Sequence, residues 1–278
     1  MAISLLQIVV CIKQIPDPEG PVDAFKIDSE GKRVIPVGIP PVINPFDENA
    51  LEAAIHLKEH YGAKVTAISM GEKLAQPVLR KALAAGADDL ILLVDQHFKD
   101  LDSHSTAYVL SKAINKMGAF DLILTGRQAG DWNFGVTGLL IAEMLQISSV
   151  NLAQKIEMRD GGICVEKLTH DGYELVKVPV PALITVSSEI GELRYISIRS
   201  LQSVNTKPVK MYRAEDLDLD PQRLTVRKVL KLSAFQGQRE CRFIEGDSPQ
   251  QRGENLALRL REDGVIGSLF NGGDFTRR

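Results

Sequence analysis

Short apolar runs alternate with amphipathic segments along the first part of the chain, up to about residue 200. Each run shows little alternation of apolar and polar positions, which is typical of parallel strands buried on both faces. The runs lie at 7–12, 64–69, 89–94 and 121–125. The segments 47–61 and 102–117 between them place their apolar residues on one helical face. This rhythm predicts an α/β fold with a doubly wound, mostly parallel sheet.

The pattern changes at two places. The segment 14–43 predicts a hairpin, with extended stretches at 22–27 and 33–37 around a turn at 28–31. After residue 150, Asp160-Gly161-Gly162 and Asp171-Gly172 are typical hairpin turns, so an antiparallel meander is expected. Its strands are expected at 153–158, 163–169 and 172–178, followed by a core strand at 182–186.

Beyond about residue 205 the chain is charged and has no apolar pattern large enough for a core until a helix expected at 249–262. Ser248 is its expected N-cap, with Pro249 and Gln251 in the first turn, and Gly264 is the stop. The apolar stripe of this helix is narrow, so it needs something to pack on. We therefore expect an α/β domain at 1–205 and a C-terminal arm at 206–278 that packs on a partner.

Composition and charge exclude several classes of protein. The chain has 278 residues and a net charge of −3, so no overall field favours nucleic acid or an anionic membrane. The three cysteines, Cys11, Cys164 and Cys241, are far apart, which argues against a disulfide framework or a cysteine metal site and favours a reducing compartment. The apolar stretch 3–12 is too short to span a membrane. We expect a soluble, cytoplasmic protein.

Two segments are candidates for ligand binding. Asn44, Pro45 and Asp47 fit the N-cap, first and third positions of a helix start, which predicts either plain capping or free N–H groups for a ligand. The glycine-rich loop 126–138 follows a buried strand, and ligands of open α/β sheets bind at that end of the strands. It matches neither GxGxxG nor the P-loop, so a nucleotide site and an ordinary loop both remain open.

The histidines offer a weaker alternative. His56 and His60 fit H-x-x-E-H, a zinc-peptidase motif, but basic groups are also expected near the C-terminal end of a helix. The other histidines have no partner at a suitable spacing, and no nucleophile–base pair can be identified. This favours a protein that holds a cofactor over a hydrolase.

Segments along nearly the whole chain resemble the beta subunit of electron-transfer flavoproteins. They are 8–17 (IVVCIKQIPD), 42–54 (VINPFDENALEAA), 65–71, 80–93, 124–131 (LTGRQAGD), 193–198 and 244–266. The resemblance implies a Rossmann-like, adenine-nucleotide-hydrolase-like fold and an obligate alpha subunit that carries FAD. It also implies a second nucleotide in this chain: AMP in simple carriers, or a second FAD, reduced by NADH, in electron-bifurcating members.

By position, the resemblance places the nucleotide contacts on the first strand, the helix start, the second core strand and the glycine-rich loop. The implied residues are Cys11, Asn44, Pro45, Phe46, Asp47, Met70, Arg127, Gln128, Ala129, Gly130, Asp131, Trp132, Asn133, Phe134, Gly135, Val136, Thr137 and Gly138. Gly130, Asn133 and Val136 depart from the usual loop, and Trp132 and Phe134 add unexpected bulk. The start of the chain, the helix entry and the tail look more like the bifurcating members, which favours FAD over AMP.

The segment 194–201 resembles the family's recognition loop, which docks a partner dehydrogenase. The implied docking residues are Arg194, Tyr195, Ile198 and Leu201, with Ile198 as the apolar anchor. The lysines that usually follow are absent, which indicates a partner different from the common acyl-CoA dehydrogenases. We expect a partner dehydrogenase of the acyl-CoA type or of another organic-acid type. Core residues of a surface helix are the competing interpretation. A stress-type ATP- or AMP-binding module without a redox role is the rival function, and it leaves the meander and the tail unexplained.

Overall fold

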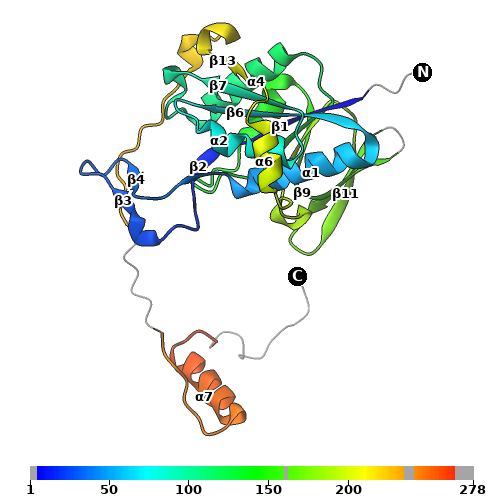
Figure 1. Ribbon diagram of the computed structural model, residues 1–278. Helices are drawn as coiled ribbons and strands as arrows, with labels where there is room; N and C mark the ends of the chain where they lie inside the picture. The colour runs from blue at the N-terminus through cyan, green and yellow to red at the C-terminus, as the bar shows by residue number, and fades with distance from the viewer. Residues whose placement is uncertain (1–4, 160–161, 235–240, 267–278) are drawn as a thin grey trace. The chain divides into compact units, whose positions relative to one another are not determined.

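The computed structural model describes residues 5–159, 162–234 and 241–266. The chain divides into two compact units, one ending at Leu232 and one beginning at Ser233. The first unit is built around a nine-stranded sheet of order β11-β10-β9-β12-β8-β1-β6-β7-β13 (Figure 1). No helix among the described residues is both long enough and apolar enough to cross a membrane.

The central strands confirm the expected parallel sheet. They are β1 (Leu6–Cys11), β6 (Ala63–Gly71), β7 (Asp89–Val94), β8 (Leu122–Gly126) and β12 (Ala182–Val186). Helices α1 (Pro45–Tyr61), α2 (Gln76–Leu79) and α3 (Lys81–Ala85) pack on one face, and α4 (Ser103–Met117) and α5 (Thr137–Leu145) pack on the other. Each face buries a separate apolar cluster, which makes the sheet doubly wound, as the pattern predicts.

The meander is also present, although its first strand begins earlier than expected. It consists of β9 (Ser148–Arg159), β10 (Gly162–Leu168) and β11 (Tyr173–Val178). The first half of β9 pairs in parallel with β12, and its second half pairs antiparallel with β10. Leu152, at φ +56°, lies where the register shifts, and its N–H donates to Thr185 Oγ1 (3.1 Å). The expected turn at 160–162 lies mostly outside the described residues.

The segment 14–43 forms two small antiparallel pairs. The pair β3 (Phe25–Ile27) and β4 (Val34–Pro36) is the expected hairpin, but 22–24 form the 3₁₀ turn η1 (Val22–Ala24) instead of extending the strand. Asp28 closes the turn by accepting the N–H groups of Lys32 (2.7 Å) and Arg33 (3.1 Å). The second pair, β2 (Gln14–Pro16) and β5 (Pro41–Ile43), leads the chain into α1.

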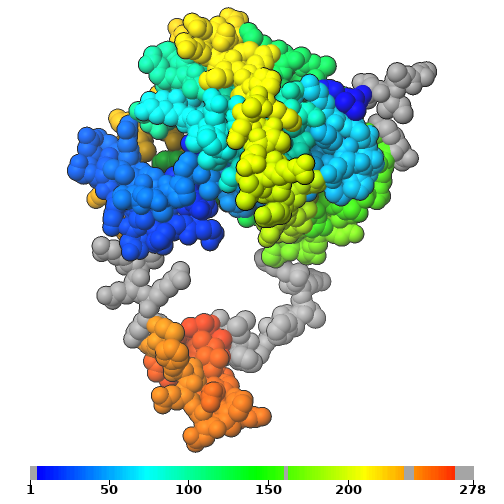
Figure 2. All heavy atoms as spheres, viewed as in Figure 1, coloured from blue at the N-terminus to red at the C-terminus, as the bar shows by residue number. Residues whose placement is uncertain are grey.

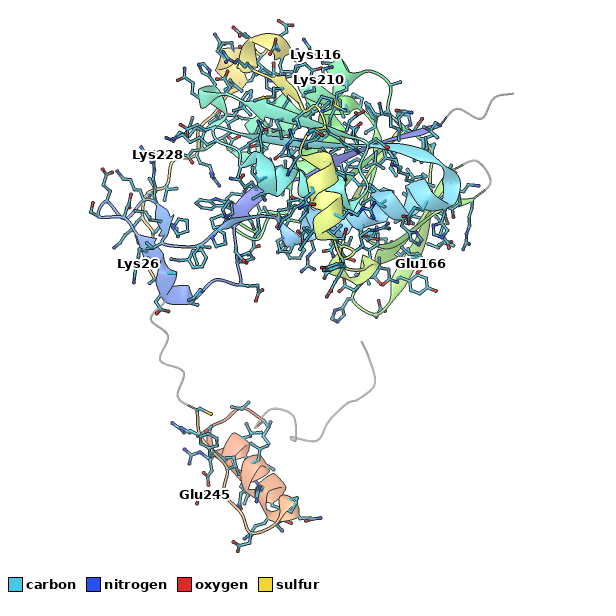
Figure 3. All side chains as sticks on the ribbon, viewed as in Figure 1. Lys26, Lys116, Glu166, Lys210, Lys228 and Glu245 are labelled. Carbon is cyan, nitrogen blue, oxygen red and sulfur yellow. The ribbon has the colours of Figure 1, made fainter. Side chains whose placement is uncertain are left out.

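Residues 206–232 continue the first unit beyond the boundary expected at 205. The strand β13 (Lys210–Tyr212) extends the sheet beside β7, and the ring of Tyr212 is buried. The ammonium groups of Lys116 and Lys210, labelled in Figure 3, lie 5.5 and 4.8 Å from the centre of that ring. The short turns η4 (Ala214–Leu217) and η5 (Pro221–Arg223) follow.

The second unit contains α7 (Pro249–Glu262), which begins as expected: Ser248 Oγ accepts the N–H of Gln251 (3.1 Å). Gly264 adopts φ +73° after the helix, a conformation in which glycine is favoured. No residue of α7 is buried in the described part of the chain, and Leu256 and Leu258 are exposed. The expected helix is therefore present, with two of its leucines exposed.

Candidate functional site

The expected nucleotide contacts converge on the carboxyl edge of the sheet, where β8, β1 and β6 are neighbours. Cys11 ends β1 and pairs with Thr125 of β8, while Met70 lies two residues beyond Ile68, the partner of Cys11 in β6. Burial, together with the nearby charge of Asp47, raises the pKa of the Cys11 thiol to about 12. The thiol is therefore protonated at neutral pH and serves as a packing group.

Asn44 connects the start of α1 to the glycine-rich loop. Its side chain is fully buried; Nδ2 donates to the carbonyl of Gln128 (2.9 Å), and Oδ1 accepts the N–H of Gly130 (3.0 Å). The expectation of a side-chain cap is therefore wrong, because both polar atoms of Asn44 are engaged by the loop. At the helix start Asn44 contributes its backbone carbonyl, which accepts the N–H groups of Asp47 and Glu48.

Asp47 joins the ends of β1 and β8. Its carboxylate accepts the N–H of Lys13 at Oδ2 (2.8 Å) and the N–H of Gly126 at Oδ1 (3.1 Å), so it does not take part in plain capping of the helix. Burial raises its pKa to about 7 even though both amides favour the charged form. A side chain on Gly126 has no room, since its Cβ would lie 2.6 Å from both Asp47 Oδ1 and the carbonyl carbon of Phe46.

The glycine-rich loop is folded by its own hydrogen bonds. The N–H of Asn133, at φ +56°, donates to the carbonyl of Ala129 (2.8 Å), and Gln128 Nε2 donates to Asn133 Oδ1 (3.0 Å). Lys13 Nζ pairs with Asp131 (2.6 Å), so the negative charge in the loop is compensated. Trp132 and Phe134 stack with their ring centres 5.9 Å apart. The loop then enters α5 at Thr137, where N–H groups without helical partners are expected.

Gly138 and Arg127 have different roles at the two ends of this loop. A Cβ on Gly138 would lie 2.6 Å from Thr125 Oγ1, so this glycine lets α5 pack closely on β8. The guanidinium of Arg127 lies 4.7 Å from the centre of the Phe46 ring. Its buried Nε has no hydrogen-bond partner within the described part of the chain. An unmatched buried donor costs about 1–3 kcal/mol, so Arg127 is poised to bind an anion.

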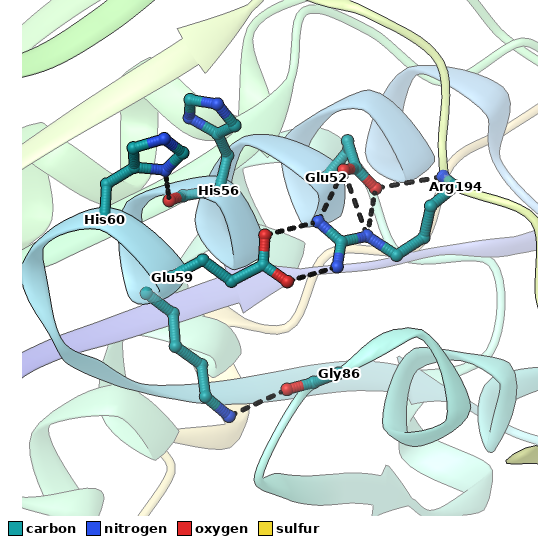
Figure 4. A network of polar contacts seen from close by, with 7 residues as sticks. Glu52, His56, Glu59, His60, Gly86 and Arg194 are labelled. Carbon is teal, nitrogen blue, oxygen red and sulfur yellow. Dashed lines mark hydrogen bonds and ion pairs between the residues drawn. The ribbon is translucent and has the colours of Figure 1, made fainter.

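The segment 194–201, which is expected to dock a partner, is fixed to α1 through Arg194 (Figure 4). Its backbone N–H donates to Glu52 (2.9 Å), and its guanidinium pairs with Glu52 (2.8 Å) and Glu59. The two carboxylates, Glu59 first, raise the pKa of Arg194 above its usual range. Arg194 therefore fixes the start of the segment 194–201 to α1.

Helix α6 (Ile198–Val204) follows Arg194 in the chain and exposes part of its apolar surface. Tyr195, just before the helix, is 89% exposed and Ile198 is 71% exposed, whereas Leu201 is half-buried and Val204 is buried. A core role for Ile198 is therefore wrong. Arg80 fastens the other end of α6 by donating to the carbonyl of Val204 (2.7 Å).

His56 and His60 stack on each other on the exposed side of α1, with ring centres 4.0 Å apart (Figure 4). His60 Nδ1 lies 2.9 Å from the carbonyl of His56, and Glu59 is engaged by Arg194. Within 5–159, 162–234 and 241–266, no cluster of three or more His, Cys, Asp or Glu side chains is suited to a metal ion.

A cavity of about 390 Å³ lies at the opposite, amino edge of the sheet, lined by the first residues of β1, β6 and β7. We assign the site to the carboxyl edge instead, since ligands of open α/β sheets bind there and the unpartnered Arg127 donor is there.

Arg227 is not among the nucleotide contacts expected from the sequence, although its guanidinium lies 3.9 Å from the centre of the Trp132 ring. No motif marks it, because the contact joins distant segments.

Known proteins with similar sequences share one family description. The family model for the electron transfer flavoprotein domain matches residues 33–217. The electron transfer flavoprotein subunit beta of Thermoanaerobacterium thermosaccharolyticum is 39% identical over 266 residues, covering 94% of this chain and 100% of that protein. The caffeyl-CoA reductase-Etf complex subunit CarD of Acetobacterium woodii is 36% identical over 218 residues, covering 78% and 82%. The acryloyl-CoA reductase electron transfer subunit gamma of Anaerotignum propionicum is 34% identical over 219 residues, covering 78% and 80%.

Proposed function

Because this chain belongs to the electron transfer flavoprotein beta subunit family, we propose that it pairs with an alpha subunit and holds a nucleotide at the carboxyl edge of its sheet. In this role it relays electrons between a donor and a partner dehydrogenase. Membership of the family sets aside the rival stress-type module. A cytoplasmic location belongs to the same proposal and is supported by three free cysteines.

The single observation that carries the nucleotide site is the buried Nε of Arg127, which has no hydrogen-bond partner among the described residues. Its guanidinium faces Phe46, and its buried Nε lacks an acceptor at the very edge where such sheets bind ligands. Asn44 and Asp47 hold the surrounding backbone through four hydrogen bonds, so the donors are in place before a ligand arrives.

The residues present fit a nucleotide and leave the redox chemistry to it. Arg127 and the N–H groups at the start of α5 would hold phosphate, while Cys11 and Met70 would line the strand ends beneath it. Bound FAD would supply the one- and two-electron chemistry. We favour FAD over AMP here, with a further FAD carried by the alpha subunit and NADH as the candidate donor.

We assign partner docking to the exposed Tyr195 and Ile198, which lie in the segment that Arg194 fixes to α1. Exposed apolar side chains on a braced segment are typical anchors of protein interfaces. The names of two relatives, a caffeyl-CoA reductase complex subunit and an acryloyl-CoA reductase subunit, support a partner that acts on acyl-CoA thioesters. Electron bifurcation belongs to the same proposal and is supported by the resemblance of the chain start, the helix entry and the tail to bifurcating members.

Replacing Arg127 tests the nucleotide site. We expect Arg127→Gln to weaken nucleotide binding by the purified heterodimer about tenfold or more, since it removes a charge-assisted contact. Lys64→Gln is the matched control, because Lys64 pairs with Asp89 at the amino edge of the sheet. Equal affinity in wild type and Arg127→Gln would remove the main support for this site.

A further inference from the structure

A second arginine approaches the glycine-rich loop from the arm segment 218–232. The guanidinium carbon of Arg227 lies 3.9 Å from the centre of the Trp132 ring, which itself stacks on Phe134. Arg127 lies at the start of the loop, beside β8, whereas Arg227 contacts its outer part. The loop is therefore flanked by two cations from different parts of the chain.

The backbone around Arg227 is anchored next to β7. The N–H of Arg227 donates to the carbonyl of Asp100 (2.8 Å), and the N–H of Thr225 donates to Ser105 Oγ (2.8 Å). The next residue pair, Leu101 and Val226, forms an antiparallel bridge. In Figure 2 this gold segment borders a hollow beside the blue hairpin, in agreement with a groove lined by the hairpin, η2 (Gln96–Phe98) and the arm.

The contact between Arg227 and Trp132 spans the middle of the carboxyl edge. Arg227 is tied to residues that follow β7, Trp132 belongs to the loop that follows β8, and β1 and β6 lie between these two strands. Cys11 and Met70 occupy the ends of β1 and β6. The arm and the loop therefore meet across the strand ends that are assigned to the nucleotide.

The donors of Arg227 are free for a ligand. Stacking on Trp132 uses the face of the guanidinium, and no hydrogen bond or ion pair within the described residues engages its N–H groups. Its buried Nε has no hydrogen-bond partner in the described part of the chain. Arg127 is in the same condition: it faces an aromatic ring and has an unpartnered Nε. Buried donors are nearly always paired in folded proteins, so two of them at one edge indicate a ligand with more than one acceptor group.

We propose that Arg227 binds a second anionic group of the nucleotide and so selects a dinucleotide, with its pyrophosphate, over a mononucleotide. This inference rests on the proposed function. The single phosphate of a mononucleotide is served by Arg127 and the start of α5. A second phosphate adds further acceptor oxygens for Arg227, and a guanidinium fork matches phosphate oxygens well.

Trp132 makes the proposal directly measurable, since it is the only tryptophan of the 278 residues. Its fluorescence reports on the loop and on the Arg227 contact. We would titrate the purified heterodimer separately with FAD and with AMP, and follow the emission of Trp132 as the difference from a heterodimer that carries Trp132→Phe. Arg223→Gln is the matched control, because Arg223 lies on the same arm and faces Tyr108 at 4.0 Å, away from the loop.

We expect Arg227→Gln to weaken FAD binding about tenfold or more and to change AMP binding by less than about twofold. Arg227→Lys, which keeps the charge without the fork, should recover part of the FAD affinity. Arg223→Gln should change neither affinity.

Three results would overturn the inference: unchanged FAD affinity in Arg227→Gln, equal losses for FAD and AMP, or tighter FAD binding, which would make the arm a cover over the site. If the wild-type chain binds neither nucleotide, the proposed function fails first and the inference falls with it. If the wild type binds and the variant binds equally well, only the inference fails.

Discussion

Two polar side chains at the start of α1 hold together three segments that meet at the carboxyl edge. Asn44 binds the loop at Gln128 and Gly130, and Asp47 binds the amides of Lys13 and Gly126. The sequence pattern identifies the first residues of a helix, but it predicts a local cap. The partners are different because buried loop amides also need acceptors, and no short-range pattern reveals which distant amides these are.

Gly126 tests how tightly these segments are packed. Gly126→Ala places a methyl group 2.6 Å from Asp47 Oδ1 and from Phe46 backbone, so we expect a loss of about 1–3 kcal/mol in the free energy of unfolding. Gly172→Ala is the control, because nothing lies within 4 Å of its Cβ. Urea denaturation compares the two; equal stability of both variants would show that the Asp47 contacts do not constrain Gly126.

Asp47 should make stability depend on pH. Burial raises its pKa from 3.8 to about 7 in the folded chain, so between about pH 4 and pH 7 the folded state binds more protons than the unfolded state. The free energy of unfolding therefore falls as pH rises through this window. Asp47→Asn should flatten that fall, whereas Asp131→Asn, at the surface pair with Lys13, should not. Parallel pH curves for wild type and Asp47→Asn would contradict the burial effect.

At the scale of elements, the strands buried on both faces could be predicted because their composition is continuously apolar, as in β7 and β8. The short strand β13 could not, because its three residues gain order from pairing with β7 and from burial of Tyr212. The early start of β9 depends in the same way on β12. Whether such strands form depends on their pairing with distant strands, and the local sequence pattern does not reveal that pairing.

Helix α6 offers two apolar side chains with opposite environments. Ile198→Ala removes about three buried carbons from a docked interface, about 2 kcal/mol, or roughly thirtyfold in partner affinity, and should barely change the melting temperature. Val204→Ala, on the buried side of the same helix, should cost about 2 kcal/mol of stability and leave the affinity of the folded protein nearly unchanged. A large loss of thermal stability in Ile198→Ala would contradict its exposed position.

At the scale of the whole molecule, the chain combines the carboxyl edge proposed to hold a nucleotide, the segment 194–201 proposed to dock a partner, and a second unit with the helix α7. Helix α1 serves the first two, because its start holds the loop and its middle holds Arg194. The division expected at residue 205 stays a prediction, and the first unit extends to Leu232. The exposed Leu256 and Leu258 of α7 support the proposal that the second unit packs on the alpha subunit.

Two truncations separate folding from assembly. A chain ending at Leu232 keeps β13, so we expect a melting temperature close to that of the full chain but a weaker heterodimer. A chain ending at Asn205 loses β13 and the buried Tyr212, so it should also lose thermal stability. Calorimetry and an alpha-subunit binding assay measure both effects. Undiminished affinity of the 1–232 chain would show that the second unit does not contact the alpha subunit.

The most direct test of the central claim is a count of the nucleotides released from the purified heterodimer by heat. We expect two nucleotides per heterodimer, both FAD, of which one is lost selectively in Arg127→Gln. A single nucleotide per heterodimer, unchanged by Arg127→Gln, would contradict the assignment of a nucleotide to the carboxyl edge of this chain.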